Sequence, residues 1–122
     1  MRHISRSKAA LIRNGTIKSY EYDMPSEAIN VAVIYVNGRY PLADFTTNKQ
    51  VESIIQVIKG TGTMGLIDGT KVGLKKGDQV HIAKNEAYFF EGAFELVYAA
   101  TPKWTAQQTG HASDLKPSAS SY

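Results

Sequence analysis

Residues 51–83 read VESIIQVIKGTGTMGLIDGTKVGLKKGDQVHIA, and this stretch decides the fold. Apolar and β-branched residues dominate four short runs in it, at 51–58, 63–67, 70–74 and 79–83. Turn signals separate these runs, namely Gly60-Thr61-Gly62, Asp68-Gly69 and Lys75-Lys76-Gly77-Asp78. Asp-Gly between two strands predicts a hairpin closed by a two-residue type I′ turn. Short strands with such frequent turns predict an antiparallel sandwich or barrel.

The flanking sequence continues the same pattern in both directions. A β-branched run covers 28–36 and ends at the turn dipeptide Asn37-Gly38, and two further strands are predicted at 87–90 and 94–100, around Glu91-Gly92. Helix signals are limited to 5–12 and 105–111, each long enough for one or two turns. The chain is therefore predicted to be all-β.

Length and composition exclude several classes of protein. A chain of 122 residues forms one domain with a core of its own. There is no cysteine, which rules out disulfides, thiolate nucleophiles and zinc ribbons. No apolar run approaches the about 18 residues of a membrane span, so we expect no membrane association and a cytoplasmic protein.

The basic charge of the chain is concentrated at its start. The net charge is +3, but the first twenty residues contain five Lys or Arg and no acid, and the remainder has a balance of −2. We expect a basic N-terminal arm with a first strand at 1–25, mostly solvated, then a barrel at 26–108 and a loose tail at 109–122. The body has no cluster of cations and aromatic residues, so no nucleic-acid partner is expected.

The region from Val51 to Pro102 resembles a cupin, a small jelly-roll β-barrel. The first cupin motif has two histidines one residue apart, a glutamate a few residues later, and a glycine after six more. With Gly60 as that glycine, the glutamate position is Ser53, Glu52 is one residue out of register, and the histidine positions fall within 46–49, which reads Thr-Thr-Asn-Lys. The steps Asn37-Gly38-Arg39-Tyr40-Pro41 and 87–92 are similar to those of small bacterial cupins of unassigned function.

The second cupin motif also departs from its usual form. With Gly77 as its first glycine, Ala83 takes the proline position, Asn85 the next glycine, Tyr88 the histidine and Gly92 the asparagine. The resemblance implies a metal held by three histidines and a carboxylate, and none of the three histidines is present at the motif positions. We therefore expect a barrel without a metal or other cofactor.

The resemblance also implies which side chains line the barrel. It places Ser53 and Tyr88 inside, and strand alternation adds Phe90 to the face of Tyr88. The other candidate ligand-binding residues are Asn48 near the mouth, Arg39 as an anion clamp after a turn, and Trp104 as a cover for the mouth. The alternative is that Tyr88 and Phe90 are ordinary core aromatics, Ser53 is a small filler and Arg39 is solvated.

Three functions remain open from the sequence. The first is metal-independent binding of a small molecule, such as a sugar or a small acid, in the barrel. The second is a metal-free isomerase, epimerase or lyase, with Tyr88 as acid or base and His81 or Glu52 assisting, although alternation puts His81 on the outer face. The third is a non-catalytic interaction protein with a filled barrel. In each case we expect a homodimer formed through strand edges.

Overall fold

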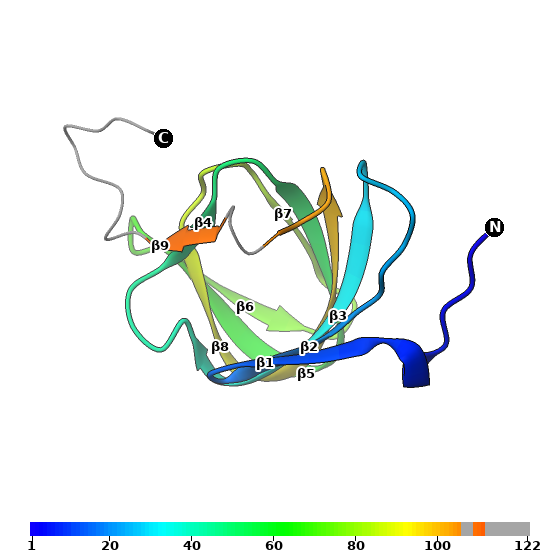
Figure 1. Cartoon of the computed structure of the whole chain (residues 1–122). Helices are drawn as coiled ribbons and strands as arrows, with labels where there is room; N and C mark the ends of the chain where they lie inside the picture. The colour runs from blue at the N-terminus through cyan, green and yellow to red at the C-terminus, as the bar shows by residue number, and fades with distance from the viewer. Residues whose placement is uncertain (106–108, 112–122) are drawn as a thin grey trace.

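The computed structural model describes residues 1–105 and 109–111. One short 3-10 helix, η1, and nine strands make up its regular structure (Figure 1). Their bounds are η1 Arg6–Lys8, β1 Ala10–Asn14, β2 Ile17–Glu21, β3 Asn30–Tyr40, β4 Thr46–Asn48, β5 Glu52–Leu66, β6 Lys71–Lys75, β7 Gln79–Ile82, β8 Tyr88–Thr101 and β9 Thr109–His111. No helix in the described part of the chain has the length and hydropathy needed to cross a membrane.

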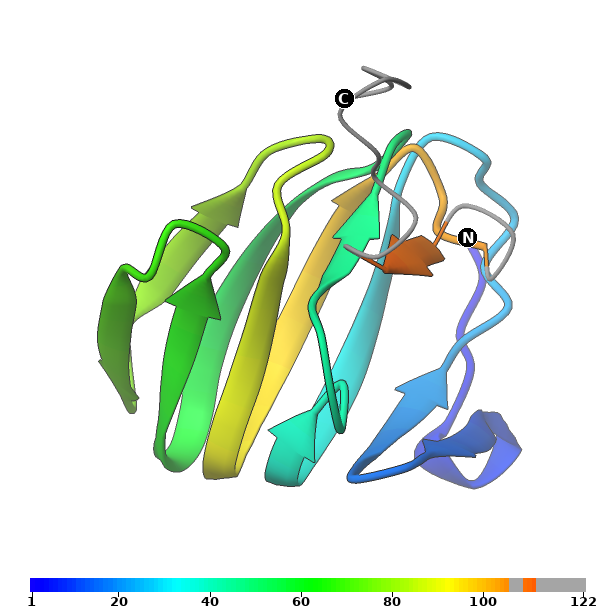
Figure 2. The same cartoon turned by 90° about the vertical axis from the view of Figure 1, so that its left-hand side faces the viewer.

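The strands form one antiparallel sheet that curves around a common interior (Figures 1 and 2). Its order is β1-β2-β3-β8-β4-β9, and β5 pairs with β6, β7 and β8. The long strands β3, β8 and β5 lie side by side, since β8 pairs with both of its neighbours along most of its length. The all-β jelly-roll barrel expected from the sequence is confirmed.

Three of the predicted turns are wrong, because the long strands β3, β5 and β8 continue through them. Asn37-Gly38, Gly60-Thr61-Gly62 and Glu91-Gly92 were expected to be turns, but they lie inside β3, β5 and β8. Gly92 pairs with Gly38 on one side and with Gly62 on the other. Glycines in one row across three strands let the backbones approach closely where the sheet bends. These glycines therefore mark a bend of the barrel wall rather than chain reversals.

The two other turns were predicted correctly in position. Lys75 to Asp78 form a turn in which the Asp78 amide donates to the Lys75 carbonyl at 3.0 Å. The β5–β6 hairpin also turns at Asp68-Gly69, but it has a three-residue loop in place of the two-residue type I′ turn. Leu66 donates to the Thr70 carbonyl at 2.8 Å, and Gly69 alone in the loop has a positive φ, of 93°.

The N-terminal segment forms two strands of the sheet where the sequence predicted one, and the residues of β1 are all exposed. Residues 10–12, predicted to be helical, belong to β1, which pairs with β2, and β2 pairs with β3. The Arg6 guanidinium lies 3.6 Å from the centroid of the Tyr20 ring and donates a 2.7 Å hydrogen bond to the Tyr35 hydroxyl. Aromatic partners on β2 and β3 thus hold the start of the chain against the barrel.

The core follows the alternation of side chains along β5. Ser53, Ile55 and Val57 are buried on the inner face, and the side chains of Glu52 and Ile54 point outward. Ile55, Val57 and Leu96 are the most completely buried side chains among the described residues. Apolar packing fills the end of the barrel around these residues and leaves a cavity toward the N-terminal hairpin.

Candidate functional site

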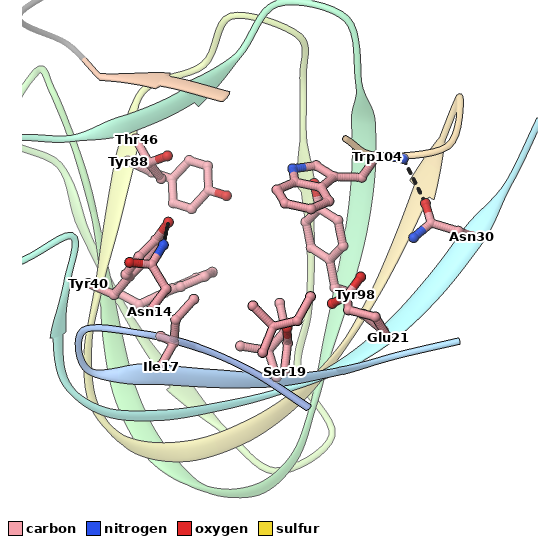
Figure 3. Close-up of a pocket in the computed structure, with 14 residues that line it drawn as sticks. Asn14, Ile17, Ser19, Glu21, Asn30, Tyr40, Thr46, Tyr88, Tyr98 and Trp104 are labelled. Atoms are coloured by element: carbon pink, nitrogen blue, oxygen red, sulfur yellow. Dashed lines mark hydrogen bonds between the residues drawn. The ribbon is translucent and has the colours of Figure 1, made fainter. Parts of the chain in front are cut away.

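A cavity of about 120 Å³ lies inside the barrel, between the β1–β2 hairpin, β3, β4, β8 and the segment that follows β8 (Figure 3). Polar and aromatic side chains form much of its wall. The lining residues are Ile12, Asn14, Ile17, Ser19, Glu21, Asn30, Ala32, Ile34, Tyr40, Thr46, Tyr88, Phe90, Tyr98 and Trp104. The cavity is therefore built from strands that are far apart in the sequence.

Tyr88 presents its hydroxyl to the cavity. It is the first residue of β8 and pairs with Thr46 of β4, and Figure 3 shows its phenol directed toward the centre. No described residue forms a hydrogen bond with this hydroxyl. Burial raises the pKa of Tyr88 far above that of a free tyrosine, and the charges that Tyr98 and Tyr40 would carry if ionised raise it further. Tyr88 therefore remains a neutral hydrogen-bond donor throughout the physiological pH range.

Two more tyrosines line the cavity, and the sequence analysis did not single out either. Burial raises the pKa of Tyr40, and a hydrogen bond with Thr46 partly offsets that rise. Burial also raises the pKa of Tyr98, against the opposing effect of a hydrogen bond with Ser53. The hydroxyls of these two phenols therefore engage the barrel wall. Alternation along β8 places Tyr98 inside, a signal that was available once the strand was known to be continuous.

The N-terminal hairpin supplies a carboxylate that the sequence analysis also missed. Ile17, Ser19 and Glu21 alternate along β2 and face the cavity, and Asn14 joins them from β1. The sequence signal for this hairpin was a glycine, Gly15, followed by a segment of alternating side chains. In the structure Gly15 lies in the turn with a positive φ of 61°. The five cations in the first twenty residues instead led to the prediction of a solvated arm. Glu21 forms no ion pair with a described residue.

Trp104 lies at the cavity as the sequence analysis expected. Its backbone amide donates a 2.9 Å hydrogen bond to the Asn30 side-chain oxygen, and Figure 3 shows the indole across the cavity from Tyr88. The adjacent Lys103 donates a hydrogen bond from its backbone amide to the Glu27 carbonyl and one from its ammonium group to the Met24 carbonyl. These contacts fix the segment after β8 over the loop that precedes β3.

The predicted ligand-binding residues separate into two groups. Tyr88, Phe90 and Trp104 line the cavity together, and Ser53 is buried behind them, within hydrogen-bonding reach of Tyr98. Asn48 does not line it. Its side-chain oxygen accepts hydrogen bonds from the backbone amides of residues 50 and 51, at 2.9 and 2.8 Å, and so fixes the turn between β4 and β5.

Arg39 also lies away from the cavity, in a structural clamp. Its guanidinium donates to the carbonyls of Pro41 and Asp44, at 2.6 and 2.9 Å, and is 4.1 Å from the centroid of the Phe89 ring. The structure therefore does not place Arg39 at the cavity as an anion clamp, since it is not a lining residue and two of its N–H groups bond backbone carbonyls. The clamp holds the loop between β3 and β4, which positions Thr46 at the cavity.

Replacing Arg39 by leucine is expected to lower the free energy of unfolding by about 2 kcal/mol, since two partly buried carbonyls lose a charged donor. Urea denaturation measures this change. Arg13→Leu is the matched control, because Arg13 is exposed on β1 and should change stability by less than about 0.5 kcal/mol. Equal effects of the two substitutions would show that the Arg39 contacts contribute nothing.

His81 and Glu52 lie on the outer face of the barrel, and neither lines the cavity. They lie on neighbouring strands, β7 and β5, and His81 Nε2 is 2.6 Å from a Glu52 carboxylate oxygen. Both side chains are exposed, whereas Ile82 next to His81 is buried. The outer-face position inferred for His81 is confirmed. Their suggested assistance to Tyr88 fails on geometry, because the sheet separates the pair from the cavity.

The side chains of the cavity do not match the metal site that the family resemblance implied. The described residues contain no group of three or more His, Cys, Asp or Glu that could hold a metal ion. The motif positions 46–49, 53 and 88 carry hydroxyl, amide and ammonium groups, and Glu21 is the one carboxylate among the lining residues. A set of neutral phenols, amides and a single carboxylate is a poor ligand set for Mn, Fe, Ni or Zn. We therefore derive no step that passes through a metal.

The fold matches several solved structures at low sequence identity. A Streptomyces Pac13 variant with uridine is 17% identical, with a TM-score of 0.82 over 91% of this chain and 89% of that chain. Pac13 is described as a nucleoside dehydratase. Ectoine synthase from P. lautus is 13% identical, with a TM-score of 0.75 over 91% and 89% of the two chains. An RmlC-like cupin from Shewanella frigidimarina is 14% identical, with a TM-score of 0.68 over 84% and 93%.

At these identities the matches show a shared fold and no shared activity. No family profile and no curated protein sequence matches this chain.

Proposed function

We propose that this chain, which has the cupin fold, binds a small organic molecule in its barrel cavity through protein side chains alone. The observation that carries the proposal is the Tyr88 hydroxyl, a neutral donor that faces the cavity without a described partner. A phenol hydroxyl that faces a cavity and is not bonded to a described residue can donate a hydrogen bond to a ligand oxygen or nitrogen. A mostly apolar cavity with a few placed polar groups is typical of small-ligand sites.

Size and charge narrow the ligand class. A cavity of about 150 Å³ holds a benzene ring. The barrel cavity, of about 120 Å³, therefore suits a single small ring or a group of similar bulk. The lining contains Glu21 and no described Lys, Arg or His, which favours a sugar-like hydroxyl compound over a small acid. The presence of uridine in the Pac13 structure is consistent with a ligand that carries a sugar ring.

Tyr88→Phe is the direct test of this proposal. We expect the affinity for a sugar probe such as D-ribose to fall about tenfold, because one hydrogen bond to the ligand is lost. Trp104 is the only tryptophan and lines the cavity, so its fluorescence reports binding. Tyr22→Phe, outside the cavity, should leave the affinity unchanged. The sugar-like ligand class fails if the sugar probe gives no saturable change, and the role of Tyr88 fails if both variants bind as the wild type does.

A second candidate, a metal-free isomerase, epimerase or lyase, is favoured by one arrangement. The protonated Tyr88 and the Glu21 carboxylate line the same cavity, so a proton donor and a proton acceptor face one ligand. Pac13, described as a dehydratase, shares the fold. Incubation with D-ribose in D₂O separates the two functions. An enzyme that moves protons at carbon would exchange a carbon-bound hydrogen of the sugar, visible by proton NMR, and a binding protein would not.

A further inference from the structure

The charge of the cavity wall is unbalanced. Glu21 of β2 contributes a carboxylate, and none of the fourteen lining residues is a Lys, Arg or His. Among the described residues, no cation forms an ion pair with Glu21 and no donor forms a hydrogen bond with it. A carboxylate in a partly enclosed site is stabilised when a positive charge lies close to it. The carboxylate of Glu21 is thus available for a positively charged ligand.

Aromatic rings surround the same space. The five aromatic lining residues are Tyr40, Tyr88, Phe90, Tyr98 and Trp104. Figure 3 shows Tyr88 on one side of the cavity and Tyr98 and Trp104 on the other, with Glu21 below Tyr98. The faces of aromatic rings are electron-rich and attract cations within about 6 Å of the ring centroid. Rings on opposite sides of a cavity, with a carboxylate in the same wall, form the type of cage that recognises alkylated ammonium groups.

The titration behaviour of the cavity phenols agrees with this geometry. The Glu21 carboxylate helps to raise the pKa of Tyr98, although burial is the larger cause. The pKa values of Tyr40 and Tyr88 are raised as well, again mainly by burial. Burial disfavours any further charge in this cavity, and the Glu21 carboxylate offsets that cost for a cation but adds to it for an anion.

We infer that the cavity is selective for a compact organic cation, an alkylated ammonium compound, held by the Glu21 carboxylate and the aromatic rings around it. This inference rests on one part of the proposed function, namely that the cavity is a ligand site, and it names an organic cation in place of the sugar-like hydroxyl compound. The small volume limits the cation to a few carbon atoms around the nitrogen. An acceptor group on the same ligand would bind the Tyr88 hydroxyl.

A comparison of three probes of similar bulk tests the charge preference. Tetramethylammonium is positively charged, tert-butanol is neutral and pivalate is negatively charged. We expect tetramethylammonium to bind at least about tenfold more tightly than tert-butanol, with pivalate the weakest, since cation–π and carboxylate contacts act only on the cation. Quenching of Trp104 fluorescence and calorimetry measure the three affinities on the full chain.

Two variants link the preference to Glu21. Glu21→Gln keeps the shape of the wall and removes the charge, so it should weaken tetramethylammonium binding about tenfold and leave tert-butanol binding unchanged. Glu91→Gln is the matched control, because Glu91 is an exposed strand glutamate that does not line the cavity, and it should retain the full preference.

The outcomes separate this inference from the proposed function. If tert-butanol binds as tightly as tetramethylammonium, or if Glu21→Gln leaves the preference intact, the inference is overturned and the cavity is still a ligand site. If tetramethylammonium, tert-butanol, pivalate and D-ribose all leave the Trp104 signal unchanged, both the inference and the proposed function are overturned.

Discussion

Gly92→Ala is expected to lower the free energy of unfolding by about 4 kcal/mol, because it adds a steric clash to backbone strain. Gly92 has a φ of +139°, in a region that residues with a side chain rarely adopt. A Cβ atom there would lie 2.6 Å from Gly62 Cα and 2.8 Å from the Thr61 carbonyl oxygen. Both atoms belong to the backbone of the adjacent strand β5, so neither can move aside as a flexible side chain would.

Two other glycines supply the controls for Gly92. Gly77 has a φ of +94° and open space around the position of a Cβ, so Gly77→Ala isolates the backbone strain, at about 1 kcal/mol. Gly73 has neither a positive φ nor a neighbour within 4 Å, and alanine there should be neutral or slightly stabilising. Urea denaturation of the three variants gives the order. A cost at Gly92 no greater than at Gly77 would contradict the close approach of β5 and β8.

The same glycines show where sequence reasoning on the fold reached its limit. A glycine in a strand-rich sequence signals a positive φ or a close backbone approach, and the local sequence does not distinguish a turn from a bend within a strand. Gly77 and Gly69 were correctly placed in turns. Gly38, Gly60 and Gly92 were placed in turns for the same reason, yet they allow long strands to bend. The difference depends on which strands pair, and pairing is not local information.

The sequence predicted one wall of the cavity and missed the other. Tyr88 and Phe90 could be placed from strand alternation and the family resemblance, and Trp104 from its position near the chain end. The opposite wall, with Ser19 and Glu21 of β2, was missed because five cations made the N-terminal segment look like a solvated arm. The guanidinium of one of these cations, Arg6, packs on the rings of Tyr20 and Tyr35 on the outside of the barrel. The homodimer expected from the sequence stays a prediction.

The three cavity tyrosines should make the protein unstable in alkali. The pKa values of Tyr40, Tyr88 and Tyr98 are raised in the folded state, mainly by burial. Above about pH 10 the unfolded chain loses these protons and the folded chain retains them, so rising pH favours unfolding. For each such tyrosine the free energy of unfolding should fall by about 1.4 kcal/mol per pH unit until its folded pKa is reached. Below about pH 9 these groups should have no effect on the pH dependence.

Tyr88→Phe isolates the largest of these contributions, because comparison with the wild type cancels every other titrating group. At pH 8 the variant reports only its packing cost. Between about pH 10 and 12 its unfolding free energy should decline less steeply than that of the wild type, by about 1.4 kcal/mol per pH unit. Phe90→Leu changes the same wall without removing a phenol, so it should displace the curve in parallel. Parallel curves for the wild type and Tyr88→Phe would show that the Tyr88 phenol ionises within the folded barrel. Burial would then not raise the pKa of Tyr88, contrary to the environment that the fold gives this phenol.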